Sequence, residues 1–145
     1  MNIDRFKHEH TEILDGIAAL RTLSRAGVAR NAAEIARGIV SMSSVIKLHL
    51  GAEDRLLYPA LQQSGNRTLA RLGARFQEEM RSILSAYMEF ARRWNTADRV
   101  IGDAEGFRAD ANRVLKSIYD RMRHEDRDFY PLIERHASCA EHQAA

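Results

Sequence analysis

A His–carboxylate pair and its altered copy are the first chemical signal in this chain. Residues 53–59 read Glu-Asp-Arg-Leu-Leu-Tyr-Pro and residues 125–131 read Glu-Asp-Arg-Asp-Phe-Tyr-Pro, which are identical at five of seven positions. His49 lies four residues before the first copy, so a helix would place an imidazole and a carboxylate one turn apart, within reach of the same metal ion. Arg121 lies at the matching place before the second copy, and a guanidinium cannot act as a ligand.

The relation between the two halves of the chain extends upstream of these copies. His10 in the first half stands where Met80 stands in the second, and three residues around it recur at an offset of 70 positions. The matched pairs are Glu9 with Glu79, Ile13 with Ile83 and Leu14 with Leu84. We therefore predict two related halves, each a helical hairpin, of which the first has kept its nitrogen ligands and the second has lost them.

The composition bounds the class of protein. The 145 residues suffice for one domain with a hydrophobic core, and 45% hydrophobic and 29% charged residues are ordinary for a soluble globular chain. The net charge is +2 and the arginines are scattered, which argues against a nucleic-acid partner. No apolar run approaches the length of a membrane span and the N-terminus lacks an apolar signal core, so we expect a cytoplasmic protein without a membrane partner. The single cysteine, Cys139, excludes an internal disulfide.

Apolar side chains recur at steps of three and four residues along four segments, which predicts four amphipathic helices. The stripes run from Ile3 to Leu20, from Ile35 to Glu53, from Leu69 to Trp94 and from Phe107 to Phe129. Gly27 is expected to end the first helix, and residues 62–66 and 95–102 are expected to connect the others. Long helices with short connections are typical of an all-α, antiparallel, up-down-up-down four-helix bundle. We expect the bundle to span residues 1–137 and a frayed tail to follow over 138–145.

Polar residues on the apolar stripes are the candidate functional residues, because bundles build cofactor sites from inward side chains of facing helices. Burying two carboxylates is unfavourable without compensation, and two nearby imidazoles make a metal ion the natural cation. Two imidazoles and two carboxylates suit iron(II), manganese or zinc. The predicted metal ligands are His10, His49, Glu53 and Glu125.

Arg121 supports a competing interpretation of the same residues. It lies one turn before Glu125, where its guanidinium would take the electrostatic role of a second metal ion. The site would then hold one metal ion with Arg121, or no metal ion, with Arg121 and the imidazoles bonding the carboxylates. Glu79 and His124 are further candidates. Glu79 neighbours Met80 and would have to swing inward, and His124 precedes Glu125 and faces away from the stripe. The tyrosines expected to close matching helix ends are Tyr58 and Tyr130.

These motifs resemble the hemerythrin-like family, four-helix bundles also called HHE cation-binding domains. The resemblance lies in Glu-His-x-x-Ile at 9–13, in His-x-x-x-Glu-Asp-x-x-Leu-Tyr-Pro at 49–59 and in Glu-Asp-x-x-Phe-Tyr-Pro at 125–131. It implies a non-haem iron cofactor, because family members with a full site hold a di-iron centre bridged by two carboxylates. By position, the resemblance implies that His10 and His49 serve the first iron, and that Glu53 and Glu125 are the former bridges.

The resemblance also implies which half of that centre is missing. The second iron would need histidines where this chain has Met80, Leu84 or Ile83, and Arg121. It therefore implies at most one iron ion. It argues against reversible dioxygen binding of the di-iron type, and also against di-iron repair or peroxide chemistry.

The expected function is that of a small metal-binding sensor or regulator. Occupancy or redox state of the ion would change the packing of the bundle, an unknown regulatory protein partner would read the change, and dioxygen or nitric oxide would be the sensed ligand. The alternative is a metal-free bundle for protein interaction or self-association, in which Arg121 neutralises both carboxylates. An oxidase or nitric-oxide-processing enzyme ranks last, because the sequence identifies no general base and no substrate pocket. The aromatic residues Tyr87, Phe90 and Trp94 have two interpretations, as the surface of a homodimer or as part of the core of the bundle.

Overall fold

The computed structural model describes residues 3–136, which are helical almost throughout and contain no β-strand. In the element labels, η marks a single π-helical turn. The elements are α1 (Asp4–Ala26), α2 (Ala32–Ala52), η1 (Glu53–Leu57), α3 (Tyr58–Gln62), α4 (Arg67–Trp94), α5 (Ala97–Gly102), α6 (Ala104–His124) and η2 (Glu125–Phe129).

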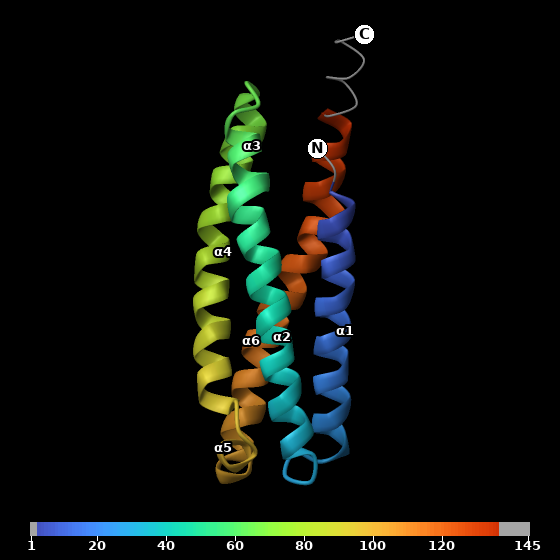
Figure 1. Ribbon diagram of the computed structural model, residues 1–145, viewed down its shortest axis with the longest axis vertical. Helices are drawn as coiled ribbons and strands as arrows, with labels where there is room; N and C mark the ends of the chain where they lie inside the picture. The colour runs from blue at the N-terminus through green and yellow to red at the C-terminus, as the bar shows by residue number, and fades with distance from the viewer. Residues whose placement is uncertain (1–2, 137–145) are drawn as a thin grey trace.

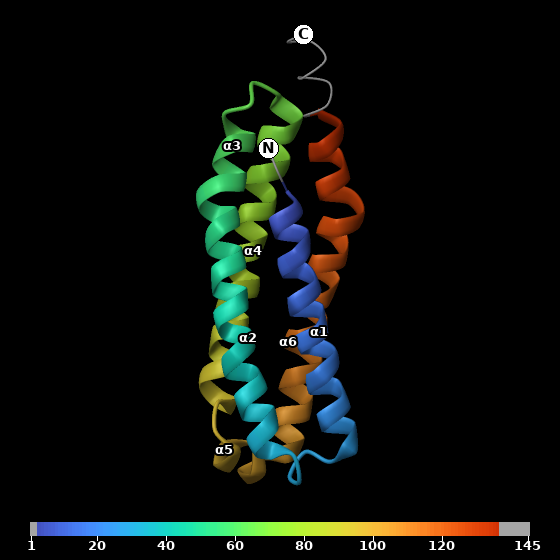
Figure 2. The ribbon, with the colours of Figure 1, turned by 45° about the vertical axis from the view of Figure 1, so that its right-hand side comes forward.

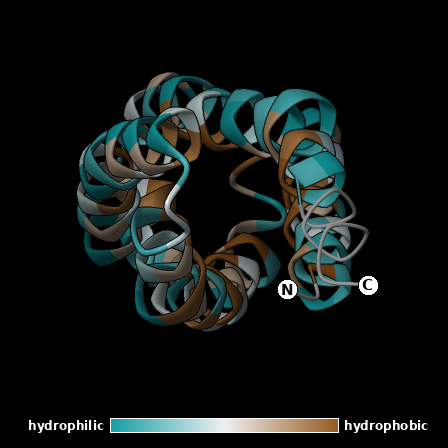
Figure 3. Ribbon diagram, turned by 90° about the horizontal axis from the view of Figure 1, so that it is seen from above, coloured by the Kyte–Doolittle hydropathy of each residue, from teal (hydrophilic) through white to brown (hydrophobic). Residues whose placement is uncertain are grey.

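Four long helices lie side by side along the long axis of the molecule (Figures 1 and 2). They are α1, α2, α4 and α6, with 23, 21, 28 and 21 residues. α1 packs against α2, α2 against α4, α4 against α6, and α6 against α1. Seen from above, the helices surround a common interior (Figure 3). The chain therefore forms an all-helical bundle, as the apolar periodicity predicts.

The predicted apolar stripes are the faces that the helices bury. Side chains at three- and four-residue steps share one face of a helix. All members of the first stripe are buried, namely Ile3, which directly precedes α1, and Phe6, His10, Ile13, Ile17 and Leu20. The three aromatic residues of α4 that were weighed as a dimer surface are also buried. Tyr87, Phe90 and Trp94 belong to the hydrophobic core.

Helix ends follow local chemistry, with one departure from expectation. α1 ends at Ala26, and Gly27 follows with a φ of +135°, a region that favours glycine. The segment 95–102, expected to be a plain connection, contains the short helix α5. The side chain of Thr96 caps this helix by accepting a main-chain N–H within its first turn at 3.3 Å, and Val100 is fully buried. Burial of one apolar residue and a good cap make this connection helical.

The core consists of two apolar clusters, one after the other along the bundle axis. Representatives of the first cluster are Ile13, Ile46, Ile118 and Met122, and of the second Phe6, Ala52, Phe76 and Phe129. Along the sequence, His10 of α1 lies between Phe6 of the second cluster and Ile13 of the first. His49 of α2 lies between Ile46 of the first cluster and Ala52 of the second. The buried polar residues therefore form a layer that separates two apolar regions.

Two further expectations concern the ends of the chain and membranes. The predicted frayed tail over 138–145 lies outside the described residues. Among the described helices, none combines the length and the apolar character that crossing a membrane requires.

Candidate metal site

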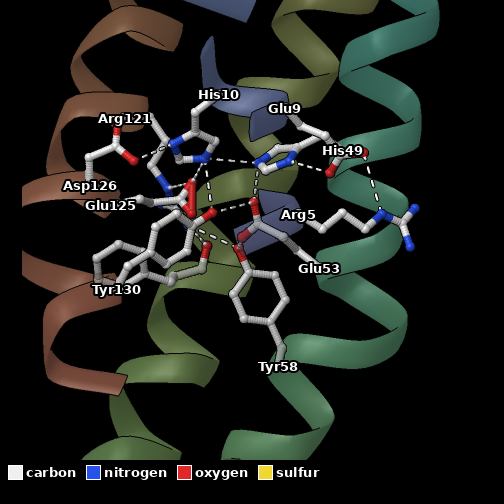
Figure 4. Close-up of polar contacts among 11 residues, drawn as sticks. Arg5, Glu9, His10, His49, Glu53, Tyr58, Arg121, Glu125, Asp126 and Tyr130 are labelled. Atoms are coloured by element: carbon white, nitrogen blue, oxygen red, sulfur yellow. Dashed lines mark hydrogen bonds and ion pairs between the residues drawn. The ribbon is translucent and has the colours of Figure 1, made fainter. Parts of the chain in front are cut away.

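Four polar side chains meet in the layer between the apolar clusters. His10 comes from α1, His49 from α2, Glu53 from the start of η1 and Glu125 from the start of η2, and none is more than 1% exposed. One potential ligand atom of each lies within 4.8 Å of those of the other three (Figure 4). The structure thus brings together all four residues that the sequence singled out, in a cluster that is a candidate metal site.

Both carboxylates stand at the start of a π-helical turn. The main-chain N–H of Tyr58 donates to the carbonyl of Glu53, and that of Tyr130 donates to the carbonyl of Glu125, which is the i→i+5 pattern of a π-turn. The wider turn brings residues i and i+5 towards one face, so that the phenols point into the site (Figure 4). The expectation that these tyrosines close helix ends is wrong, because the chain stays helical beyond each of them.

The two histidines are oriented by carboxylates behind them. Nδ1 of His10 lies 2.8 Å from Oδ1 of Asp126, and Nδ1 of His49 lies 3.0 Å from Oε1 of Glu9. These contacts turn both Nε2 atoms inward, where they lie 3.0 Å from each other. A metal-binding histidine typically has a carboxylate or carbonyl on its other nitrogen in this way.

Most atoms that point into the site are hydrogen-bond acceptors, and few of them carry a hydrogen to donate. If each Nδ1 carries its hydrogen towards the carboxylate behind it, both Nε2 atoms are bare lone pairs. Nε2 of His49 also contacts Oε1 of Glu53, a further acceptor. The hydroxyl of Tyr130 lies 2.9 Å from Nε2 of His10 and 3.4 Å from Oε1 of Glu53, and its one hydrogen serves one of them at a time. A cation fits this set of converging lone pairs better than hydrogen bonds do.

Glu125 is the least satisfied member of the cluster. Neither of its carboxylate oxygens has a hydrogen-bond partner among residues 3–136, although both are buried. Its nearest charges are Nε of Arg121, 3.4 Å from Oε1, and Nε2 of His10, 3.7 Å from the same oxygen. Glu53, in contrast, accepts a hydrogen bond of 3.0 Å from the hydroxyl of Tyr58. A buried carboxylate without donors requires compensation, and a bound ion would provide it.

The electrostatics of the cluster point the same way. Burial, followed by the charge of Glu53, raises the pKa of Glu125 to about 8. Burial also raises the pKa of Glu53 and lowers the pKa of His10. Arg121 supplies one positive charge to two buried carboxylates, which leaves one negative charge uncompensated when both are ionised. Without a cation, the raised pKa keeps a proton on Glu125 below about pH 8; a divalent cation would displace this proton and compensate both carboxylates.

Glu79 and His124, the further candidates, lie outside the site. The side chain of Glu79 is 47% exposed and pairs with Arg75 at 3.1 Å and with Arg121 at 3.5 Å. His124 pairs with Asp128 at 3.5 Å on the surface of the molecule. Each is the neighbour of an inward residue, and the helical step of about 100° turns it away from the interior.

The sequence analysis assigned no role to Glu9 and Asp126. Each directly adjoins a predicted ligand, Glu9 beside His10 and Asp126 beside Glu125. Both side chains reach sideways to the neighbouring helix. The available signal was chemical, because histidine ligands usually have a carboxylate behind them and acidic residues beside the ligands are the nearest source.

The comparisons with known proteins agree with this geometry. The model of the hemerythrin HHE cation binding domain matches residues 1–133, which include all four clustered residues. No curated protein and no solved structure matches the chain.

Proposed function

The chain belongs to the hemerythrin HHE cation-binding domain family, and from this premise we propose that it is a metal-binding sensor or regulatory protein. A domain of this type implies a metal cofactor, typically iron. The proposed ligands of one non-haem iron ion are His10, His49, Glu53 and Glu125. Manganese and zinc accept the same donors and are the competing ions.

One observation carries the proposal. The inward Nε2 atoms of His10 and His49 converge with the carboxylates of Glu53 and Glu125, and Glu125 has no hydrogen-bond donor among the described residues. Bound there, the ion would supply positive charge to the carboxylates and a redox-active centre for dioxygen or nitric oxide. The protein's own part is to orient the imidazoles, to bury the carboxylates and to keep water out with the apolar clusters on both sides.

Two residues support a stoichiometry of one ion. Met80 and Arg121 stand where a full family site would place histidines for a second iron. Arg121 is buried and its charge would repel a second cation beside Glu125. The proposed site is therefore an incomplete form of the di-iron centre.

The proposed output of the sensor follows from where the ligands are attached. The four residues lie on α1, on α2 with η1, and on η2, so that ion occupancy would affect three of the long helical segments at once. We take these to be members of an antiparallel up-down-up-down bundle over residues 1–137, because the colours of Figure 1 run along the four long helices in alternating directions. A regulatory protein partner in the cytoplasm, or a second copy of the chain, would read the change.

The decisive experiment measures metal content by elemental mass spectrometry on protein purified without an affinity tag, beside an optical spectrum. We expect near one iron per chain and no oxo-bridged di-iron bands. His10→Ala should abolish binding, whereas His8→Ala should not, because His8 is exposed and pairs with Glu12 at 3.2 Å. A content near two would mean that other residues supply ligands, and equal metal content in both variants would refute the assignment of the site.

The competing function is a metal-free bundle that acts as a protein-interaction module. The contact of 3.4 Å between Nε of Arg121 and Oε1 of Glu125 favours it, since this pair already places a cation inside the site. Absence of metal, even after anaerobic loading with iron(II), would establish this alternative.

A further inference from the structure

Each of the two histidines is supported by a carboxylate from a neighbouring helical segment and not from its own. His49 belongs to α2, and its Nδ1 contacts Glu9 of α1 at 3.0 Å. His10 belongs to α1, and its Nδ1 contacts Asp126 of η2 at 2.8 Å. Figure 4 shows both contacts on the outer side of the imidazole pair. Helix α1 therefore contributes the candidate ligand His10 and also Glu9, the carboxylate that supports His49. The carboxylate that supports His10 comes from η2.

The two supports differ in their surroundings. The side chain of Glu9 is 10% exposed and is backed by Nε of Arg5 at 3.6 Å. The side chain of Asp126 is 34% exposed, so its contact with His10 lies at the edge of the buried layer. Each carboxylate fixes its histidine in the tautomer that presents a bare Nε2 inward, and its charge strengthens that nitrogen as a donor to a metal.

We propose that Glu9 and Asp126 are positioning residues that set the affinity of the site for its ion. Because each lies on a different helical segment from the histidine that it supports, ion binding is coupled to the docking of α1. The inference rests on the proposed function. If α1 moved away from its neighbours, the site would lose the ligand His10 and the support of the ligand His49 in one step. Because coupling is reciprocal, an ion that requires a docked α1 stabilises the docking of α1 by the same free energy. Helix α1 is then the element that reports occupancy of the site.

The first test measures the dissociation constant of iron(II), under anaerobic conditions, for Glu9→Gln and Asp126→Asn. Each substitution keeps the size of the side chain and removes the charge behind one histidine. We expect affinity to fall about 10- to 100-fold in each variant, as for other outer-sphere carboxylates. Asp126→Ala should fall further than Asp126→Asn, because the amide oxygen still accepts the Nδ1 hydrogen and the methyl group cannot.

Two matched controls separate positioning from general electrostatics. Glu12→Gln and Asp128→Asn remove one carboxylate each from surface His–carboxylate pairs, with His8 at 3.2 Å and with His124 at 3.5 Å. These variants carry the same charge change on α1 and η2 and should bind iron(II) as the unmodified protein does. Equal affinity in the test variants and the controls would overturn the positioning role.

The second test measures amide hydrogen exchange along the full chain with and without iron(II). We expect the ion to slow exchange in α1 more than in α5, which lies at the end of the bundle opposite to the start of α1 (Figure 1). At equal iron concentration the slowing should shrink in Glu9→Gln and Asp126→Asn. Tight binding without a change in α1 would overturn the coupling and leave the proposed function intact, whereas failure of the unmodified protein to bind iron(II) would overturn the proposed function itself.

Discussion

Arg121 is the residue whose contacts decide between the two proposed functions. Its Nη2 donates to the carbonyl of Phe76 at 2.8 Å and to the hydroxyl of Tyr58 at 3.2 Å. The guanidinium also lies over the ring of Phe76, 4.2 Å from its centre. Towards Glu125 it offers only Nε at 3.4 Å, without hydrogen-bond geometry. The guanidinium is therefore anchored mainly by the main chain and the phenol, and it compensates Glu125 only in part.

Removing this guanidinium gives a direct test. In the metal-free protein, Arg121→Ala should lower the free energy of unfolding by on the order of 3–5 kcal/mol, because it leaves buried carboxylates without their counter-charge. With iron(II) bound the loss should be smaller, since the ion compensates the same charge. Urea denaturation with and without the ion measures both values. Arg113→Ala is the control, because that arginine is exposed and pairs with Asp110 only at 3.8 Å. Equal losses in both states would contradict a shared electrostatic role.

Glu125 predicts a second effect, on the dependence of stability on pH. Its pKa of about 8 in the folded protein lies above its ordinary value of 4.5, so the folded state binds more protons than the unfolded state between these values. The contribution of this group to stability is therefore present at low pH and is lost as pH rises towards 8. The lowered pKa of His10 acts in the opposite direction, but only below its ordinary value of 6.5. The window from pH 6.5 to 8 therefore reports the buried carboxyl pair, because the pKa of the neighbouring Glu53 is raised as well.

Metal-free protein should become less stable by about 1–2 kcal/mol between pH 6.5 and 8, which is the range for a group that titrates over this interval. Chemical denaturation at both pH values measures the change. Glu125→Gln should reduce this decrease, because one of the two coupled carboxyl groups no longer titrates. Bound iron(II) should remove it, because the ion keeps both carboxylates ionised throughout. A decrease of the same size in Glu125→Gln would assign it to other groups.

At the scale of the elements, apolar periodicity predicted most of the fold. It fixed the four long helices and their buried faces, because burial of a stripe requires only a repeat of three and four residues. It also placed His49 and Glu53 on one face, since the α-helix is regular up to the residue that opens η1. Such a repeat does not predict η1 and η2, in which main-chain hydrogen bonds join residues i and i+5 and not i and i+4. Tyr58 and Tyr130, which precede Pro59 and Pro131, were predicted to close helix ends, although their hydroxyls contact Glu53 and His10.

The contacts between elements explain why other parts of the site escaped prediction. Glu9 and Asp126 act across helix boundaries, on residues 40 and 116 positions away in the sequence. Such pairs depend on the distance and rotation of neighbouring helices, which a single helical repeat does not specify. The position of Arg121 was predicted from its spacing, but its bond to Phe76 depends on how α4 packs against α6. Its bond to Tyr58 depends also on how α3 packs against α4.

At the scale of the whole molecule, the two halves place one polar layer between two apolar clusters. The first half supplies both histidines of that layer, and the second half supplies Met80 and Arg121 at the matching places. Both residues are buried. Met80 lines the same groove as Tyr58, and Arg121 donates a hydrogen bond to the hydroxyl of Tyr58. The difference between the two halves of the sequence therefore places the imidazole ligands in one half of the polar layer and a thioether and a positive charge in the other.

If this asymmetry sets the stoichiometry, restoring the symmetry should restore a second ion. The double variant Met80→His, Arg121→His adds two imidazoles and removes the competing positive charge, so its metal content should rise from near one ion per chain towards two. Elemental mass spectrometry measures the content, and oxo-bridged di-iron bands should emerge in the optical spectrum. The double variant Met80→Leu, Arg121→Met is the control, because it removes the charge without adding nitrogen ligands and should keep a single ion. A content that stays at one in the histidine variant would show that these two imidazoles are insufficient to hold a second ion, since the resemblance implies a further histidine at Leu84 or Ile83.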